Sequence, residues 1–200
     1  VKAILLLGMP AMFGLILLAQ PMLMVLFMRG AFSITDVEMA SYSLVAYGAG
    51  LLSFMMIKVL APGYYSRHDT KTPVKFGIIA MVTNMFFNLI FAIPFGYVGL
   101  AIATSMSALL NAGLLYRGLH KAGVYQVSRS TLIFTFKVFV ATAVMSGLLI
   151  YFSPAQSQWL SWNIGHRMLM LIALISAGAL SYLMTLLLLG VRPWKIKKAP

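Results

Sequence analysis

The chain has 200 residues, of which 62% are hydrophobic and 9% are charged, and its mean hydropathy is +0.95. Soluble domains have about 45–50% apolar and about 25% charged residues, so this composition excludes an ordinary soluble protein and predicts helices in lipid. The formal net charge of +12 would suggest nucleic acid for a soluble chain. In a membrane chain, the distribution of the positive residues between the two sides indicates orientation instead, and we expect no nucleic-acid partner. The absence of cysteine excludes a disulfide framework and a thiolate metal site.

The apolar runs predict six membrane-spanning helices. Each run is long enough to cross the roughly 30 Å of bilayer hydrocarbon as a helix. The runs cover residues 3–28, 39–62, 76–95, 98–119, 131–152 and 166–189. Proline removes helical hydrogen bonds, so we expect bends at Pro10 and Pro21 in the first run and at Pro62 in the second. The predicted fold class is an all-α polytopic membrane protein.

The start of the chain predicts a position within a longer protein. The sequence begins with Val1, and an apolar run begins at Ala3 without the basic leader and cleavage site of a signal peptide. We therefore expect a piece of a longer membrane protein.

Several runs carry signals for helix ends. Arg29-Gly30 is expected to end the first run. Thr35-Asp-Val-Glu38 has capping-box spacing for the second run, and Thr72-Pro73 offers a cap and a first-turn proline for the third. Small or short polar residues recur every four positions, which predicts close helix packing, at Gly99, Ala103, Ser107 and Asn111 and at Ala173, Ala177, Ser181 and Thr185.

Cations are distributed unevenly between the two ends of the runs. Eleven Lys and Arg residues lie on one side and two on the other. The cation-rich side comprises Lys2, 63–75, 117–130 and 190–200, and the cation-poor side comprises 29–38, 95–98 and 153–167. Positive residues favour the cytoplasmic side, so both ends of the chain are predicted to be cytoplasmic. Lys137, in the first turn of the fifth run, is expected to snorkel to that surface.

Side chains that could perform acid–base or metal chemistry are few. They lie at or near run ends, at Asp36, Glu38, His68, Asp69, His120 and His166. The predicted topology divides them between the two sides of the membrane, so they cannot form one catalytic or metal-binding cluster. We therefore expect no enzyme and no cofactor, while coupling to an ion or to the membrane potential stays open.

Polar residues inside the predicted spans are the candidates for binding a transported substrate: Lys58, Asn84, Asn88 and Asn111. An intramembrane cation marks a functional site by default, but Lys58 is also close enough to the span end to reach the membrane surface. Asn84 and Asn88 lie one turn apart and either line a hydrated path or hydrogen-bond to a neighbouring helix. The sequence leaves both alternatives open.

Three stretches resemble one transporter family. They are Leu26-Phe-Met-Arg-Gly-Ala-Phe32 followed by Asp36, the segment Lys58-Val-Leu-Ala-Pro-Gly-Tyr-Tyr-Ser-Arg-His-Asp-Thr-Lys-Thr-Pro-Val-Lys75, and Asn111-Ala-Gly-Leu-Leu-Tyr116. With the basic tail, the similarity covers essentially the whole chain. The sequence is similar to the MurJ (MviN) family of lipid II flippases, in the multidrug/oligosaccharidyl-lipid/polysaccharide exporter superfamily.

The resemblance implies a fragment of a fourteen-helix exporter fold, with the six runs as helices nine to fourteen. Residues 1–122 would be four helices of the second transporter lobe, and residues 123–200 a terminal helix pair with a basic cytoplasmic tail. The implied function is transport of undecaprenyl-pyrophosphate-linked peptidoglycan precursor from the inner to the outer leaflet of a bacterial cytoplasmic membrane by alternating access. The implied partners are this lipid, membrane lipids and the N-terminal part of the same transporter.

The two chemical parts of such a lipid need two kinds of binding surface. Its anionic headgroup needs a hydrated, cationic path, to which Lys58 would contribute, and its prenyl chain needs an apolar groove, expected from the fifth and sixth spans. The segment with Pro62, Gly63, Asp69 and Pro73 combines a helix-ending Pro-Gly with a Thr-Pro restart, which predicts a cytoplasmic hinge. The alternatives are another exporter of the superfamily, carrying a polysaccharide-linked lipid or a drug, and a membrane scaffold whose basic loops hold anionic lipids.

Overall fold

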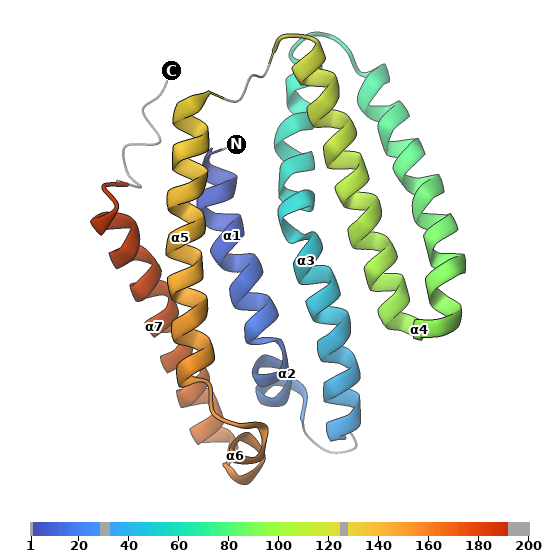
Figure 1. Cartoon of the computed structure of the whole chain (residues 1–200). Helices are drawn as coiled ribbons and strands as arrows, with labels where there is room; N and C mark the ends of the chain where they lie inside the picture. Colours follow the sequence, from blue (N-terminus) through green and yellow to red (C-terminus); the bar gives the residue numbers. More distant parts are fainter. Residues whose placement is uncertain (1, 29–32, 125–127, 192–200) are drawn as a thin grey trace.

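The computed structural model describes residues 2–28, 33–124 and 128–191, which fold into α-helices joined by short connections (Figure 1). The helices are α1 (Lys2–Leu17), α2 (Ala19–Phe27), α3 (Ile34–Tyr65), α4 (Lys71–Lys121), α5 (Arg129–Phe152), α6 (Gln156–Ser161) and α7 (Ile164–Leu188). Among the described residues, α3, α4, α5 and α7 are long and apolar enough to cross a membrane, and the bent pair of α1 and α2 makes a fifth candidate span. The prediction of an all-α membrane fold is confirmed at this level.

The longest helix, α4, folds back on itself. Its 51 residues would extend for about 76 Å in a straight helix, more than twice the thickness of bilayer hydrocarbon. The backbone reverses at Gly96, where φ is 54° and ψ is −132°, a conformation that glycine adopts because it has no Cβ. The two legs of α4 lie side by side (Figure 1), and Asn84 Nδ2 on the first leg donates to Ser107 Oγ on the second at 3.0 Å. The break predicted at 95–98 is confirmed.

Pro21 explains the break between α1 and α2. Proline has no backbone N–H, so the Leu17 carbonyl loses the donor that a continuous helix would supply at residue 21. The chain leaves helical geometry at Leu18, and α1 and α2 are bent by 67°. The predicted bend at Pro21 is confirmed.

The other two prolines do not interrupt their helices. In α1, the Leu6 carbonyl that Pro10 leaves without a helical donor accepts a hydrogen bond of 2.6 Å from the Tyr182 hydroxyl of α7. Helix α3 continues beyond Pro62, so the helix end predicted there is wrong. The Ser66 N–H donates to the Pro62 carbonyl, which allows a last helical turn to form after the proline.

The start of α3 differs from the predicted one. Ser33 and Asp36 form a reciprocal capping box, in which each side chain accepts the backbone N–H of the other residue. The box predicted at Thr35–Glu38 is therefore wrong, because the helix already begins at Ile34. Arg29-Gly30, the predicted end of the first run, lies outside the described residues.

The start of α4 also lies earlier than predicted. The helix begins after Thr70, and the Asp69 carboxylate accepts the Thr72 backbone N–H at 3.0 Å. The predicted cap at Thr72 is therefore wrong, because Thr72 lies inside the helix and its own N–H donates to Asp69. Pro73 lies in the first turn, as predicted.

Helix α1 lies between α3 and α5, while the two legs of α4 extend from the far side of α3 (Figure 1). The larger hydrophobic cluster joins α1, α2, α5, α6 and α7, with the start of α3. A smaller cluster ties the end of α3 to the end of α4 through Leu60, Tyr64, Leu115 and Leu119. The predicted division between residues 1–122 and 123–200 stays a prediction.

The two rows of small residues have different roles. In α4, Gly99, Ala103 and Ser107 are buried, and a Cβ at Gly99 would overlap the Phe91 carbonyl oxygen, so the predicted close packing is confirmed there. In α7, the predicted row is not the buried one. The stripe that α7 buries comprises Leu171, Leu174, Gly178, Tyr182 and Leu186. A helix that is apolar on all sides gives no sequence signal for the face that it buries.

Candidate functional site

Polar side chains gather between the two legs of α4. Asn84 Nδ2 lies 3.0 Å from Ser107 Oγ and 3.5 Å from Thr104 Oγ1 on the other leg. Asn88 Nδ2 donates to Asn84 Oδ1 at 2.9 Å. The two asparagines therefore share one face and hydrogen-bond across the hairpin, and their role toward a substrate stays a prediction.

Asn84, Thr104 and Ser107 line a groove of about 380 Å³ between α3 and α4. Its lining comprises Phe54, Ile57, Gly77, Ala80, Met81, Asn84, Thr104, Ser107, Ala108 and Asn111. The side-chain oxygens of Asn88 and Asn111 are buried and have no hydrogen-bond partner among the described residues. A buried amide oxygen is unfavourable unless it accepts an N–H or O–H, so this region retains capacity for hydrogen bonds beside apolar walls.

Lys58 lies on α3 with an exposed side chain. It forms no hydrogen bond or ion pair with another residue in the described part of the chain, and it does not line the groove to which Phe54 and Ile57 contribute. Its ammonium is therefore available to an anion from outside this chain, such as a phosphate or a carboxylate. Its proposed role in substrate binding stays a prediction.

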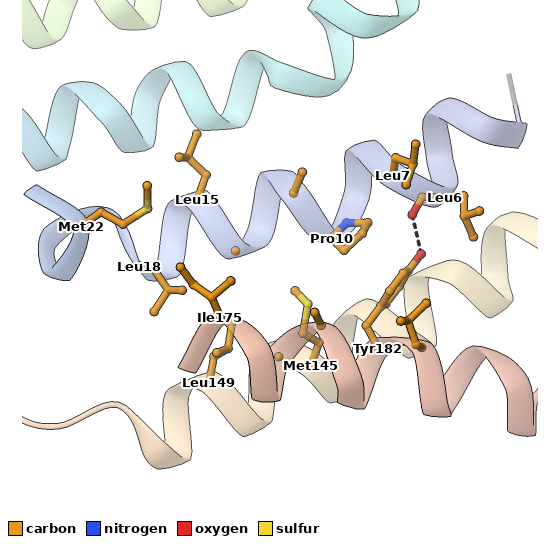
Figure 2. A pocket seen from close by; sticks show the side chains of 15 residues that line it. Leu6, Leu7, Pro10, Leu15, Leu18, Met22, Met145, Leu149, Ile175 and Tyr182 are labelled. Carbon is orange, nitrogen blue, oxygen red and sulfur yellow. Dashed lines mark hydrogen bonds between the residues drawn. The ribbon is translucent and has the colours of Figure 1, made fainter. Parts of the chain in front are cut away.

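A second groove is apolar. It encloses about 460 Å³ between α1 and the pair of α5 and α7 (Figure 2). Its lining comprises Leu6, Leu7, Pro10, Ala11, Gly14, Leu15, Leu18, Met22, Met145, Leu149, Ile175, Gly178, Ala179, Tyr182 and Leu183. The hydroxyl of Tyr182 is already bonded to the Leu6 carbonyl, as the dashed line in Figure 2 shows. The groove therefore suits an aliphatic ligand, because the other lining side chains are apolar.

The sequence predicts this groove from the fifth and sixth spans alone, and the structure adds α1. Pro10, Ala11 and Gly14 have little bulk and lie on the groove side of α1. Apart from the adjacent residues and nearby backbone of α1, no atom lies within 4 Å of the position that a Cβ would take at Gly14, so the groove is open there. This run of residues with little bulk is the sequence signal for the groove, but the sequence does not say which helices face it.

The end of α3 is held against α4. The Tyr64 hydroxyl donates to the Leu115 carbonyl at 2.8 Å. A Cβ at Gly63 would lie 3.2 Å from the Leu119 side chain, so this glycine permits a close approach of the two helices. Pro62 and Gly63 therefore belong to a helix rather than a free loop, and Gly63 packs against α4.

The short connection from α3 to α4 is fixed by Asp69. Hydrogen bonds from the Thr72 side chain and then from the Thr72 N–H hold the pKa of the Asp69 carboxyl below its ordinary value. The carboxyl is therefore ionised at neutral pH, where it caps the N-terminus of α4. The four residues predicted to form a hinge lie in or next to this connection: Pro62, Gly63, Asp69 and Pro73. Their role as a hinge stays a prediction.

The remaining acids and one histidine have structural partners. Asp36 caps α3, Glu38 accepts a hydrogen bond of 2.9 Å from Gln156, and the His166 ring contacts Trp162 edge to face. Among the residues that the structure describes, no group of three or more His, Cys, Asp or Glu side chains could hold a metal ion.

The described chain combines long apolar helices, a groove with polar groups between α3 and α4, and an apolar groove against α1. This combination defines a multi-pass membrane protein with binding surfaces for both polar and aliphatic groups. The family model described as Lipid II flippase MurJ matches residues 1–184. The chain belongs to the MurJ family, whose members are transporters, and the prediction that it is not an enzyme is confirmed by this membership.

Individual relatives support the same assignment. The probable lipid II flippase MurJ of Vibrio cholerae is 60% identical over 199 residues, which cover 100% of this chain and 38% of the relative. That of Haemophilus influenzae is 58% identical over 192 residues, which cover 96% of this chain and 38% of the relative. The chain thus spans about 38% of the length of these relatives.

A solved structure shows the same fold. It is described as lipid II flippase MurJ in an inward closed conformation, and it matches with a TM-score of 0.75 at 24% sequence identity. The match covers 90% of this chain and 35% of that chain. The described helices therefore have the arrangement found in part of that flippase.

Proposed function

We propose that the chain contributes six of the fourteen membrane-spanning helices of a lipid II flippase. The count of six takes the α1–α2 pair as one span and the two legs of α4 as two. The complete protein would move undecaprenyl-pyrophosphate-linked peptidoglycan precursor from the inner to the outer leaflet of a bacterial cytoplasmic membrane by alternating access. The family match over residues 1–184 carries this proposal. Rescue of precursor transport in cells depleted of their own flippase is the experiment that tests it.

The two grooves correspond to the two parts of such a lipid. The sugar and peptide groups would hydrogen-bond to Asn84 and Asn111, which line the groove with polar groups, and to Asn88, which donates to Asn84. The pyrophosphate would pair with the ammonium of Lys58. The prenyl chain would lie in the apolar groove of α1, α5 and α7, where each buried methylene contributes about 0.8 kcal/mol.

The proposed domains meet at the apolar groove. Residues 1–122 would form the lobe that contains α1, and residues 123–200 the terminal pair that contains α5 and α7. The groove is lined by residues of both parts, which supports a joint role in holding the tail of the cargo.

We place both ends of the chain in the cytoplasm. Lys2 Nζ at the start of α1 donates to Ser130 Oγ at the start of α5 at 3.1 Å. Lys137 Nζ donates to the Leu189 carbonyl just after α7 at 2.7 Å, so this lysine caps a helix terminus rather than only snorkelling. These contacts gather three helix ends and their cations at one end of the bundle, which supports retention of that end on the cytoplasmic side.

Labelling of single cysteines should confirm this orientation. In the full-length protein, cysteines placed at Ser66, Ser128 and Ala199 should be shielded from an impermeant thiol reagent in intact cells, because the cation-rich connections face inward. Cysteines at Ser33 and Gln156 should react. This chain contributes no native cysteine to the background. Labelling at Ser128 in intact cells would overturn the proposed topology.

Substitution at the α3–α4 junction should impair transport more than abundance if the junction is a hinge. Pro62→Ala and Asp69→Ala change the last turn of α3 and the cap of α4 without adding bulk. Asp36→Ala is the matched control, because it removes an aspartate from the capping box of α3. Transport and membrane abundance are measured together for each variant. An equal loss of both in Asp69→Ala would make the junction a folding element instead.

A further inference from the structure

The two prolines of the first span each release a backbone carbonyl, but only one of these carbonyls has a partner shown above. Pro10 releases the carbonyl of Leu6, which accepts the Tyr182 hydroxyl at 2.6 Å. Pro21 releases the carbonyl of Leu17 in the same way, at the 67° bend. The backbone hydrogen bonds found at this break run from Leu18 to Gly14 and from Met22 to Leu18, and neither involves Leu17.

A pocket of about 280 Å³ lies at this break. Leu17 lines it, and so does Trp159 of α6. Unlike the apolar groove nearby, it also collects polar side chains from α2, α3, α6 and the connection after α5: Gln20, Ser41, Tyr42, Ser153 and Gln156. The pocket is therefore polar enough to hold water between helices.

Trp159 supplies a buried donor at the same place. Its side chain is 2% exposed, and its Nε1 has no hydrogen-bond partner among the described residues. A buried N–H without an acceptor is unfavourable, so native proteins supply one, often as ordered water. The residue that carries this unpartnered donor and the residue whose carbonyl proline releases thus line one pocket.

We propose that this pocket is a water-binding site in which water accepts the Trp159 indole N–H and donates to the Leu17 carbonyl. The pocket exceeds the space that a single water molecule needs, so it has room for such a bridge. The bridge links α6 to the break in the first span, as the Tyr182 hydroxyl links α7 directly to α1. Water exchanges partners readily, so this water-mediated link tolerates changes in the angle of α2 that a direct hydrogen bond would resist.

NMR of the full-length protein in lipid nanodiscs tests this site. The protein is labelled with 15N-tryptophan, and transfer of magnetisation from water to each indole proton is measured. The Trp159 resonance is the one that disappears in Trp159→Phe and that broadens when a nitroxide is attached through Ser161→Cys. We expect a cross-peak from water to the Trp159 indole proton despite the burial of its ring.

Two proline substitutions complete the test. Pro21→Ala supplies the missing N–H to the Leu17 carbonyl, so the water cross-peak should be lost and the bend should straighten. Pro10→Ala is the matched control, because it restores an N–H at the other proline, and it should leave the cross-peak unchanged. The absence of a water cross-peak in the unmodified protein would overturn the proposal. An unchanged cross-peak in Pro21→Ala would equally overturn it, because the water would not depend on the released carbonyl.

Discussion

Replacement of Lys58 by glutamine in the full-length protein should remove most transport at normal membrane abundance. A hydrogen bond between charged groups contributes about 1.5–3 kcal/mol, so its loss corresponds to a roughly tenfold to hundredfold reduction. Lys58→Ala should behave in the same way, whereas Lys58→Arg should retain much of the transport, because arginine also donates to phosphate. The readout is outer-leaflet precursor in cells that express each variant at matched levels.

Lys121→Gln is the matched control for charge. Lys121 is an exposed cation in the last turn of α4, so its replacement removes one positive charge outside the proposed path. Transport should stay near normal in this variant. If Lys58 only snorkels, its neutral replacements should also be tolerated, because they remove the cost of holding a charge near hydrocarbon. Near-normal transport in Lys58→Gln would therefore refute the binding role and leave the asparagines of α4 as candidates.

Filling the apolar groove at Gly14 should also strongly reduce transport. Gly14→Phe would project a ring into the groove without meeting another atom near its Cβ, so the fold itself should tolerate the change. Exclusion of about three methylenes of the prenyl chain would cost about 2.4 kcal/mol, which corresponds to a roughly fiftyfold weaker interaction. The readout is again outer-leaflet precursor at matched abundance.

Gly147→Phe is the matched control for the groove. Gly147 lies on α5, is exposed and does not line the groove, and no atom apart from the adjacent residues and nearby backbone of α5 lies within 4 Å of its Cβ position. Both substitutions replace a helical glycine with the same ring, so their effects on helix propensity are comparable. Equal transport in the two variants would show that the groove does not hold the tail.

Local chemistry made several features predictable from the sequence. Pro21 has no N–H to donate, which favours a break near Leu18, although Pro10 and Pro62 leave their helices unbroken. A break within residues 95–98 followed from two apolar runs too long for one span, and glycine at position 96 permits the reversal. The shared face of Asn84 and Asn88 follows from helical spacing alone.

Features that depend on tertiary neighbours were not predictable in this way. Apolar residues surround most of these helices, so no polar face indicates how each helix is rotated. The contribution of α1 to the apolar groove and the buried stripe of α7 are consequences of that missing signal. The starts of α3 and α4, with capping hydrogen bonds to Ser33 and Asp69, were missed for a local reason, since several Ser, Thr and Asp residues compete for each cap.

The most direct test of the central claim is rescue of lipid II transport. Cells are depleted of their own flippase and supplied with the full-length protein that contains this chain, and lipid-linked peptidoglycan precursor in the outer leaflet is quantified. We predict that the protein restores outer-leaflet precursor and that Lys58→Gln at matched abundance does not. Normal membrane insertion without restored precursor would contradict the proposed function and favour another cargo of the exporter superfamily or a scaffold role.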